Sequence, residues 1–226
     1  PFDRNSIYGM YNRTENYQSD CSYISQIKAF KDNVSIKSCL SYTFSVSNSQ
    51  GTSLIKDRPF TAEMTRSIML LKEKPYRPRM ADYRIGVFFT GREQLGEGAK
   101  TTAPVYYANR WDIQPSDTAA YLRGEKVKPT KQIVFYIDNT FPEKWKPYLR
   151  EGVTQWNELF EQIGLKDVVA AKDFPTDDPE FDPDNIKYSC VRYAPSSIEN
   201  AMGPSWVDPR SGEILNASVY LYHNVI

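Results

Sequence analysis

Residues 34–46 carry an apolar side chain at every second position, and only Ser38 breaks the series. Most of the residues between these positions are polar, so the period of two predicts a strand with one buried face. Residues 23–30 alternate in part, and Asp32-Asn33 supplies a turn between the two stretches. Together with a third run at residues 67–71, these patterns predict a β meander in the first third of the chain.

A helical period replaces the alternation after residue 140. The apolar positions are spaced by three or four residues, as on one face of an amphipathic helix: Trp145, Leu149, Val153, Trp156, Phe160 and Ile163. We expect one long helix with Thr140 as the N-cap, Pro142 in the first turn and Gly164 as the C-terminal cap. This helix is expected to pack on a sheet, with both tryptophans in the core.

Short strands precede and follow this helix. The nearly continuous apolar run at residues 132–138 predicts a strand that is covered on both faces. Further strands are expected at residues 168–171, 186–194 and 216–222. Residues 206–214 are expected to form a β-hairpin with Gly212 in the left-handed conformation.

These elements predict an α+β fold in three parts. Residues 1–73 form a β-rich accessory region, residues 74–130 a connector with short strands, and residues 131–226 a half-domain with a twisted mixed sheet and one long helix. The connector is expected to contain strands at residues 85–90 and 104–113 and a helical turn at residues 119–124. Its charged, proline-marked end at residues 126–131 predicts the boundary before the half-domain.

The composition restricts the classes of partner. The chain has 226 residues with 28 basic and 28 acidic side chains, and this balance gives no argument for binding nucleic acid, which needs a concentrated basic face. No run of about 18 apolar residues is present, so no membrane-spanning helix is predicted. Pro1-Phe2-Asp3-Arg4 does not resemble a signal peptide. Localisation must therefore be inferred from other features.

Two further features leave alternatives open. Cys21 and Cys39 could meet across neighbouring strands as a disulfide, whereas buried free thiols are the simpler interpretation for these two and for Cys190. The acidic loop at residues 173–185 has the carboxylates that calcium prefers but lacks the glycine and the closing glutamate of an EF-hand. The three prolines of the loop favour a rigid, solvated connector.

Several phrases of the sequence are distinctive when they are taken together. They lie at residues 75–89, 105–113, 133–165, 188–195 and 203–226, and they include PYRPRMADYRIGVFF, VYYANRWDI, YSCVRYAP and GPSWVDPRSGEILNASVYLYHNVI. In these phrases the chain resembles a family of large bacterial zinc-dependent metallopeptidases of metzincin type, known mainly from Bacteroidetes, which carry domains of formerly unknown function. The resemblance covers roughly the last two-thirds of the chain well and the first third loosely.

The resemblance implies a secreted, periplasmic or cell-envelope protein in which residues 131–226 form the upper wall of a substrate cleft. In such enzymes an extended peptide or protein substrate pairs with the strand at the edge of the cleft, which is β-augmentation. By position, this edge would be residues 216–222. The expected substrate-binding residues are Gly203, Ser205, Trp206, Asn216, Ser218 and Tyr220. An internal and merely structural strand at residues 216–222 is the alternative.

The catalytic half of such an enzyme is missing from this sequence. A catalytic zinc takes about three protein ligands, usually histidines, plus water, whereas the chain has one histidine, His223, and no H-E-x-x-H motif. We therefore expect no catalytic residue, no metal ligand and no peptide cleavage in this stretch. The zinc ligands would lie in a C-terminal catalytic half of the same polypeptide, outside this chain.

The rival interpretation is a complete, stand-alone β-rich module that binds a peptide or a glycan without catalysis. Two features argue against it. The family-like phrases continue to the end of the chain, which finishes on a strand without a polar tail. In addition, the aromatic side chains of the expected helix follow a core period and do not form an exposed platform.

Overall fold

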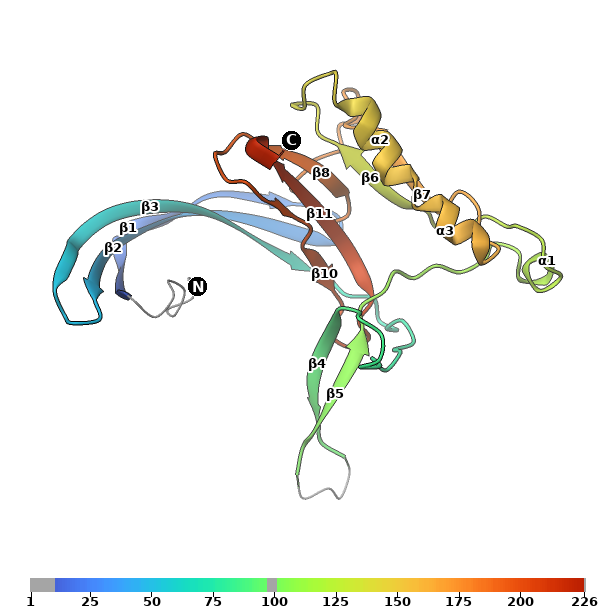
Figure 1. The fold of residues 1–226 in the computed structure, drawn as a ribbon, viewed down its shortest axis with the longest axis horizontal. Helices are drawn as coiled ribbons and strands as arrows, with labels where there is room; N and C mark the ends of the chain where they lie inside the picture. Colours follow the sequence, from blue (N-terminus) through green and yellow to red (C-terminus); the bar gives the residue numbers. More distant parts are fainter. Residues whose placement is uncertain (1–10, 97–100, 226) are drawn as a thin grey trace. The chain divides into compact units, whose positions relative to one another are not determined.

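The computed structural model describes residues 11–96 and 101–225. Residues 1–4, considered above for a signal peptide, lie outside these ranges. The fold is strand-rich and of mixed α+β class, as expected, and it divides into two compact units, Pro1–Leu70 and Leu71–Ile226 (Figure 1). Within the described ranges, no helix has both the length and the apolar character needed to cross a membrane.

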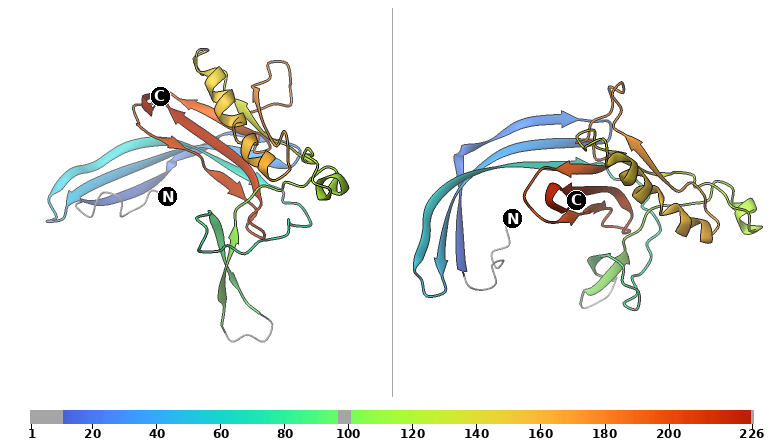
Figure 2. Two further views of the ribbon diagram at one scale, coloured as in Figure 1. Left: turned by 45° about the vertical axis from the view of Figure 1, so that its right-hand side comes forward. Right: turned by 45° about the horizontal axis from the view of Figure 1, so that its top comes forward.

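The first unit is a three-stranded antiparallel sheet in the order β1–β2–β3. Its strands are β1 (Tyr11–Ala29), β2 (Asn33–Asn48) and β3 (Ser53–Met69), long curved ribbons that confirm the predicted meander (Figure 2). β1 and β3 extend well beyond the alternation that predicted them. Cross-strand aromatic pairs stabilise the additional length, since the rings of Tyr17 and Tyr42 lie 5.4 Å apart and those of Tyr42 and Phe60 lie 5.3 Å apart.

β1 contains a large bulge. The register with β2 shifts between Gln18 and Tyr23, so that residues 19–22 lie opposite Leu40 alone. Side-chain bonds replace the missing ladder, because the Ser41 amide donates to a serine hydroxyl of the bulge at 3.0 Å. The bulge therefore holds surplus residues without breaking the sheet.

The cysteines are free thiols in this structure. Cys21 lies exposed in the bulge, Cys39 is half-buried and lies opposite Tyr23, and Cys190 is buried in the second unit. Burial raises the pKa of the Cys190 thiol to about 12. Cys190 is therefore protonated at neutral pH and is no candidate for a nucleophile.

The second unit is built around a mixed sheet in the order β10–β11–β8–β6–β7, with β9 also paired to β11. β7, β6, β8 and β11 are parallel to one another, and β9 and β10 run antiparallel to β11. The strands are β6 (Ile133–Ile137), β7 (Val169–Asp173), β8 (Ser189–Ala194), β9 (Ala201–Met202), β10 (Ser205–Val207) and β11 (Ile214–Tyr222). The predicted strands after residue 131 and the hairpin, with Gly212 at a φ of +73°, are confirmed.

The prediction of one long helix from Thr140 is wrong at its start. The helical region begins with α2 (Lys146–Thr154), and Pro147 occupies its first turn. Thr140 does not cap this helix, because its amide and its hydroxyl both donate to Asp138 Oδ1, at 2.9 and 2.8 Å. The hydrogen-bond donors of Thr140 are therefore used in a local turn before the helix begins.

The helical region is also divided in two. α2 ends at Thr154, and α3 (Asn157–Gln162) follows after Gln155 and Trp156. The Thr154 hydroxyl donates to the Arg150 carbonyl at 2.9 Å, a bond of the kind that bends helices. The end of α3 agrees with the sequence, since Gly164 takes a φ of +82° just beyond the last turn.

The connector contributes a small hairpin and one helical turn to the second unit. β4 (Phe89–Gln94) pairs antiparallel with β5 (Ala103–Ala108), and α1 (Thr118–Leu122) is capped by the Asp117 carboxylate. Residues 126–131 are bonded to the rest of the second unit, because the amide of Val127 donates to Gly164 O at 3.0 Å. The division between the two compact units falls at Leu70–Leu71.

Two clusters of apolar side chains form the core of the second unit. One joins the connector to the sheet and contains Ala120, Val127, Ile133, Leu165, Val168 and Val169. The other lies beneath the start of α2 and contains Ile137, Phe141 and Val191. Helix α2 lies against β6 and β7, and its Leu149 and Val153 also pack on the cluster that contains Val191 of β8.

Candidate functional site

β11 is an internal strand of the sheet. On one side, Ser218–Tyr222 pair in parallel with Cys190–Ala194 of β8. On the other side, β10 pairs with the first half of β11 and β9 pairs with its second half. Residues 216–222 therefore form an internal strand, which is the alternative that the sequence left open. The outer edge of the sheet is formed by β9 and β10.

The six expected substrate-binding residues separate into two groups. Gly203, Ser205 and Trp206 are exposed at the outer edge. Ser218 and Tyr220 lie half-buried on β11. The side chain of Asn216 is only 2% exposed.

The hydrogen bonds of Asn216 show a structural role. Its amide nitrogen donates to the Ile186 carbonyl at 2.8 Å and to the Tyr188 carbonyl at 2.9 Å. These bonds join β11 to the segment that leads into β8. Asn216 is therefore not available to a ligand at the edge.

Sequence patterns missed β9. Ala201 and Met202 pair with Leu221 and Tyr220 and complete the edge beyond β10. Both residues are exposed. A strand of two residues has no periodicity, so no signal in the sequence could have placed it.

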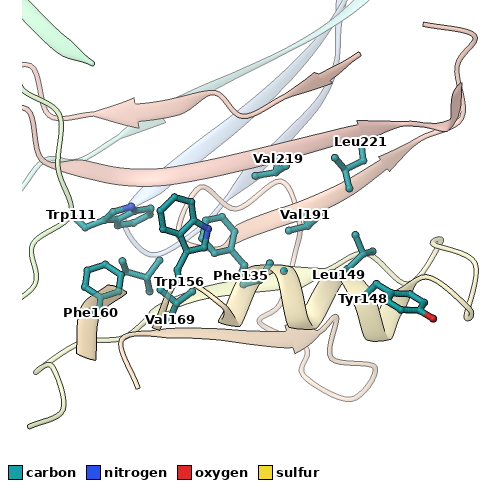
Figure 3. A pocket seen from close by; sticks show the side chains of 13 residues that line it. Trp111, Phe135, Tyr148, Leu149, Trp156, Phe160, Val169, Val191, Val219 and Leu221 are labelled. Carbon is teal, nitrogen blue, oxygen red and sulfur yellow. The ribbon is translucent and has the colours of Figure 1, made fainter. Parts of the chain in front are cut away.

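An apolar pocket of about 580 Å³ lies between the helices and the sheet. Figure 3 shows helical side chains opposite those of β6, β8 and β11. The helices contribute Tyr148, Leu149, Gly152, Val153, Trp156 and Phe160, and the rest of the lining is Trp111, Ile133, Phe135, Val169, Val191, Val219 and Leu221. Because no lining residue carries a charge, the pocket can hold apolar groups but offers no acid, base or metal ligand.

The single histidine is engaged in a local contact. His223 lies in the 3₁₀ turn after β11 (His223–Val225), and its Nδ1 atom shares a hydrogen bond with the Tyr193 hydroxyl at 2.5 Å. The Trp145 ring lies 5.9 Å from the imidazole, centroid to centroid. Over residues 11–96 and 101–225, no three His, Cys, Asp or Glu side chains are grouped as a metal site would require.

Two carboxylates of the acidic loop accept hydrogen bonds within its own turns, whereas Asp173 pairs with Arg150 outside the loop. Asp178 accepts from the amide of Glu180 at 2.9 Å, and Asp182 accepts from the amide of Asp184 at 2.8 Å. Such Asx turns are typical of an ordered connector. Aromatic rings of Tyr136, Phe174, Phe181 and Tyr188 pack beneath the same loop.

One protein-family model matches the chain. It is described as a domain of unknown function, DUF5117, and it aligns with residues 3–116, half of the chain. The chain belongs to the DUF5117 family. No curated protein and no solved structure matches it.

The DUF5117 match crosses the division between the two compact units. It extends over β1–β3 of the first unit and over residues 71–116 of the second, including β4 and β5. The sheet with the exposed edge, β6–β11, lies beyond the match. In this DUF5117 protein the candidate binding edge and the family domain therefore belong to neighbouring stretches of sequence.

Proposed function

We propose that this DUF5117 chain is the non-catalytic N-terminal portion of a secreted or cell-envelope zinc-dependent metallopeptidase. Its sheet forms the upper wall of the cleft, and its outer edge, β9 and β10, binds the peptide or protein substrate. The observation that carries the proposal is this exposed edge, with Gly203, Ser205 and Trp206 along it. The resemblance of residues 133–165, 188–195 and 203–226 to the metzincin-type family supports it.

The edge is suited to binding one extended peptide. An added strand bonds to the main chain of an edge, and alternate side chains then determine specificity. β9 and β10 are short and are separated by Gly203 and Pro204, so the edge is blunted against uncontrolled pairing with other chains. Met202 and Trp206, which are 49% and 41% exposed, are apolar contacts for a substrate side chain.

The residues of this chain do not fit a catalytic zinc. Such a site needs about three ligands, and His223, the only histidine, is bonded to Tyr193. Zinc and its ligands therefore belong, in this proposal, to the C-terminal catalytic half of the parent polypeptide. The chain itself contributes the binding edge and no step of the hydrolysis.

The first test is to read the coding sequence beyond Ile226 and to assay the full-length product. An H-E-x-x-H with a third histidine within a few tens of residues, together with cleavage of casein that a chelator abolishes, is the expected result. A stop codon at this point or an unrelated domain would refute the peptidase proposal.

A stand-alone binding module is the second candidate, and exposed aromatic side chains favour it. Tyr83 and Phe88, just before β4, are 98% and 88% exposed. Aromatic surfaces of this kind bind sugars and apolar peptides. Screening the chain against glycans and peptides distinguishes the candidates: glycan binding that Phe88→Ala abolishes would favour the module.

A further inference from the structure

The outer strand β10 cannot set its own position. It pairs with β11 through Ser205, Trp206 and Val207 only, and its register shifts between Trp206 and Val207. A hairpin with so few pairs is marginally stable by itself, and its register depends on the turn. The turn that joins β10 to β11, residues 208–213, therefore decides where the edge lies.

Four of the six residues of this hairpin turn are buried, which is unusual for a connection that carries polar side chains. Asp208, Ser211 and Glu213 are 1%, 0% and 5% exposed. Inside the turn, Asp208 accepts from the amide and the guanidinium of Arg210 at 2.8 and 2.7 Å. The amide of Gly212 donates to the Asp208 carbonyl at 2.8 Å.

The residues that bury the hairpin turn come from the DUF5117 match. Lys72 Nζ lies 2.7 Å from Glu213 Oε1, and the Lys72 carbonyl accepts from the Arg210 guanidinium at 2.7 Å. The main chain of Arg110 bonds on both sides of Glu213, donating to Gly212 O at 3.0 Å and accepting from the amide of Ile214 at 2.9 Å.

Arg110 is itself held by the same segment of the chain. Its guanidinium lies over the Tyr76 ring, 4.2 Å from the centroid, and donates to the Arg77 carbonyl at 2.6 Å. The Ala108 carbonyl lies so close to Gly212 that an added Cβ atom would be 2.6 Å from it. Residues 72–77 and 108–110 therefore enclose the turn from two directions.

The ion pair at the centre is sensitive to the loss of one partner. The Glu213 side chain is 6% exposed, and its Oε2 atom has no hydrogen-bond partner among the described residues. Without Lys72 the buried carboxylate would lose its ion-pair partner and keep only the electrostatic interaction with Arg210, which destabilises this position of Glu213. Movement of Glu213 would displace the turn and, with it, β10.

We propose that residues 72–77 and 108–110 of the DUF5117 domain act as positioning residues for the β10 edge, with Lys72 and Arg110 fixing the turn that sets its register. This inference rests on the proposed function, in which that edge binds substrate. It gives the domain a specific role, namely to hold the strand to which an extended peptide would pair.

Hydrogen–deuterium exchange on the whole chain tests this proposal. We expect Lys72→Met to speed exchange of the Trp206 and Asp208 amides, which face β11, about tenfold, with β6 unchanged, because local opening is coupled to the turn. Lys72→Arg should restore protection, since it keeps the charge. Lys74→Met, at an exposed neighbouring lysine, is the matched control. Unchanged exchange in β10, or faster exchange in β6 as well, would overturn the proposal.

A second variant and a second readout keep the two proposals separate. Glu213→Gln removes the charge but keeps the shape, so it should affect β10 less than Lys72→Met while leaving the fold intact. Anisotropy of fluorescein-labelled casein peptides reports binding, which should weaken in Lys72→Met and recover in Lys72→Arg. If the unaltered chain binds no peptide, the proposed function fails, whereas the exchange result still decides whether the segment positions the edge.

Discussion

Gly212 would have a closer contact from an added methyl group than Gly164 or Gly91 in the part of the chain that the structure describes. Its φ of +73° is left-handed, and a Cβ atom would lie 2.6 Å from the Ala108 carbonyl oxygen. We expect Gly212→Ala to lower the free energy of unfolding by about 2–4 kcal/mol, because conformational strain and a backbone contact add. Denaturant unfolding measures the change.

The control for this substitution is Gly124→Ala. Gly124 also has a left-handed φ, of +87°, but open space surrounds its Cβ position. Only the conformational cost of about 1 kcal/mol is expected there. Equal losses in the two variants would show that the contact with Ala108 has no effect.

Asp208 gives the turn a pH dependence. The hydrogen bond from Arg210 lowers the pKa of the Asp208 carboxyl below its ordinary value of 3.8. A lowered pKa means that the ionised form stabilises the fold above pH 3.8 and that this contribution is lost as the pH falls through the lowered pKa. Thermal unfolding should show Asp208→Asn less stable than the unaltered chain near pH 6, with the difference shrinking below about pH 3.8. A difference in stability between the two chains that stays constant well below pH 3.8 would contradict this.

At the scale of elements, the side chain of Asn157 joins α3 to β7 by hydrogen bonds. Asn157 donates to the Val169 carbonyl and accepts from the Val169 amide, both at 2.8 Å. Asn157→Ala should lower the free energy of unfolding by about 2–3 kcal/mol, because it leaves two buried main-chain groups of β7 without partners. Gln162→Ala on the exposed side of α3 is the control, and a similar loss there would refute the explanation.

Elements whose signal is local were predictable from the sequence. The apolar run at β6, the left-handed glycines at residues 164 and 212, and the alternation of β2 each depend on neighbouring residues only. The start of α2 was not, because Thr140 is an adequate N-cap in sequence but its hydroxyl is bonded to Asp138. Whether the Thr140 hydroxyl caps the helix or bonds to Asp138 depends on the local geometry, which the spacing of residues in the sequence does not show.

At the scale of the whole molecule, the end of the family match does not coincide with a structural boundary. The match stops at residue 116, whereas residues 71–116 belong to the second compact unit. Within this stretch, Lys72 and Arg110 bond to the hairpin turn. We expect a chain of residues 1–116 to keep β1–β3 but to be cleaved rapidly between residues 71 and 116 in limited proteolysis. Full protection of that segment in the short chain would show that it folds without the turn.

The identity of the sheet edge also belongs to this scale. The sequence places the strand at residues 216–222 correctly, but strand order depends on pairing between distant segments, and β9 is too short to be seen. Three of the six expected binding residues still lie at the edge, because the chain reaches β10 immediately before the turn that returns it as β11. The position of Gly203, Ser205 and Trp206 just before residues 216–222 in the sequence thus placed them near the edge, although residues 216–222 are not the edge strand themselves.

The bulge in β1 has a consequence for how this sheet can change in length. Partner positions sum to 59 at the pair Gln18 and Ser41, to 62 at the pair Tyr23 and Cys39 and to 63 at the pair Gln26 and Lys37. The bulge therefore inverts the odd-and-even phase of the strand, and the second register shift, between Ile24 and Gln26, restores it. Removing one residue from the bulge would turn every preceding side chain of β1 to the opposite face, whereas removing two would not. Over this stretch we therefore expect insertions and deletions of two residues to be tolerated better than those of one, because only an even number keeps each side chain on its face.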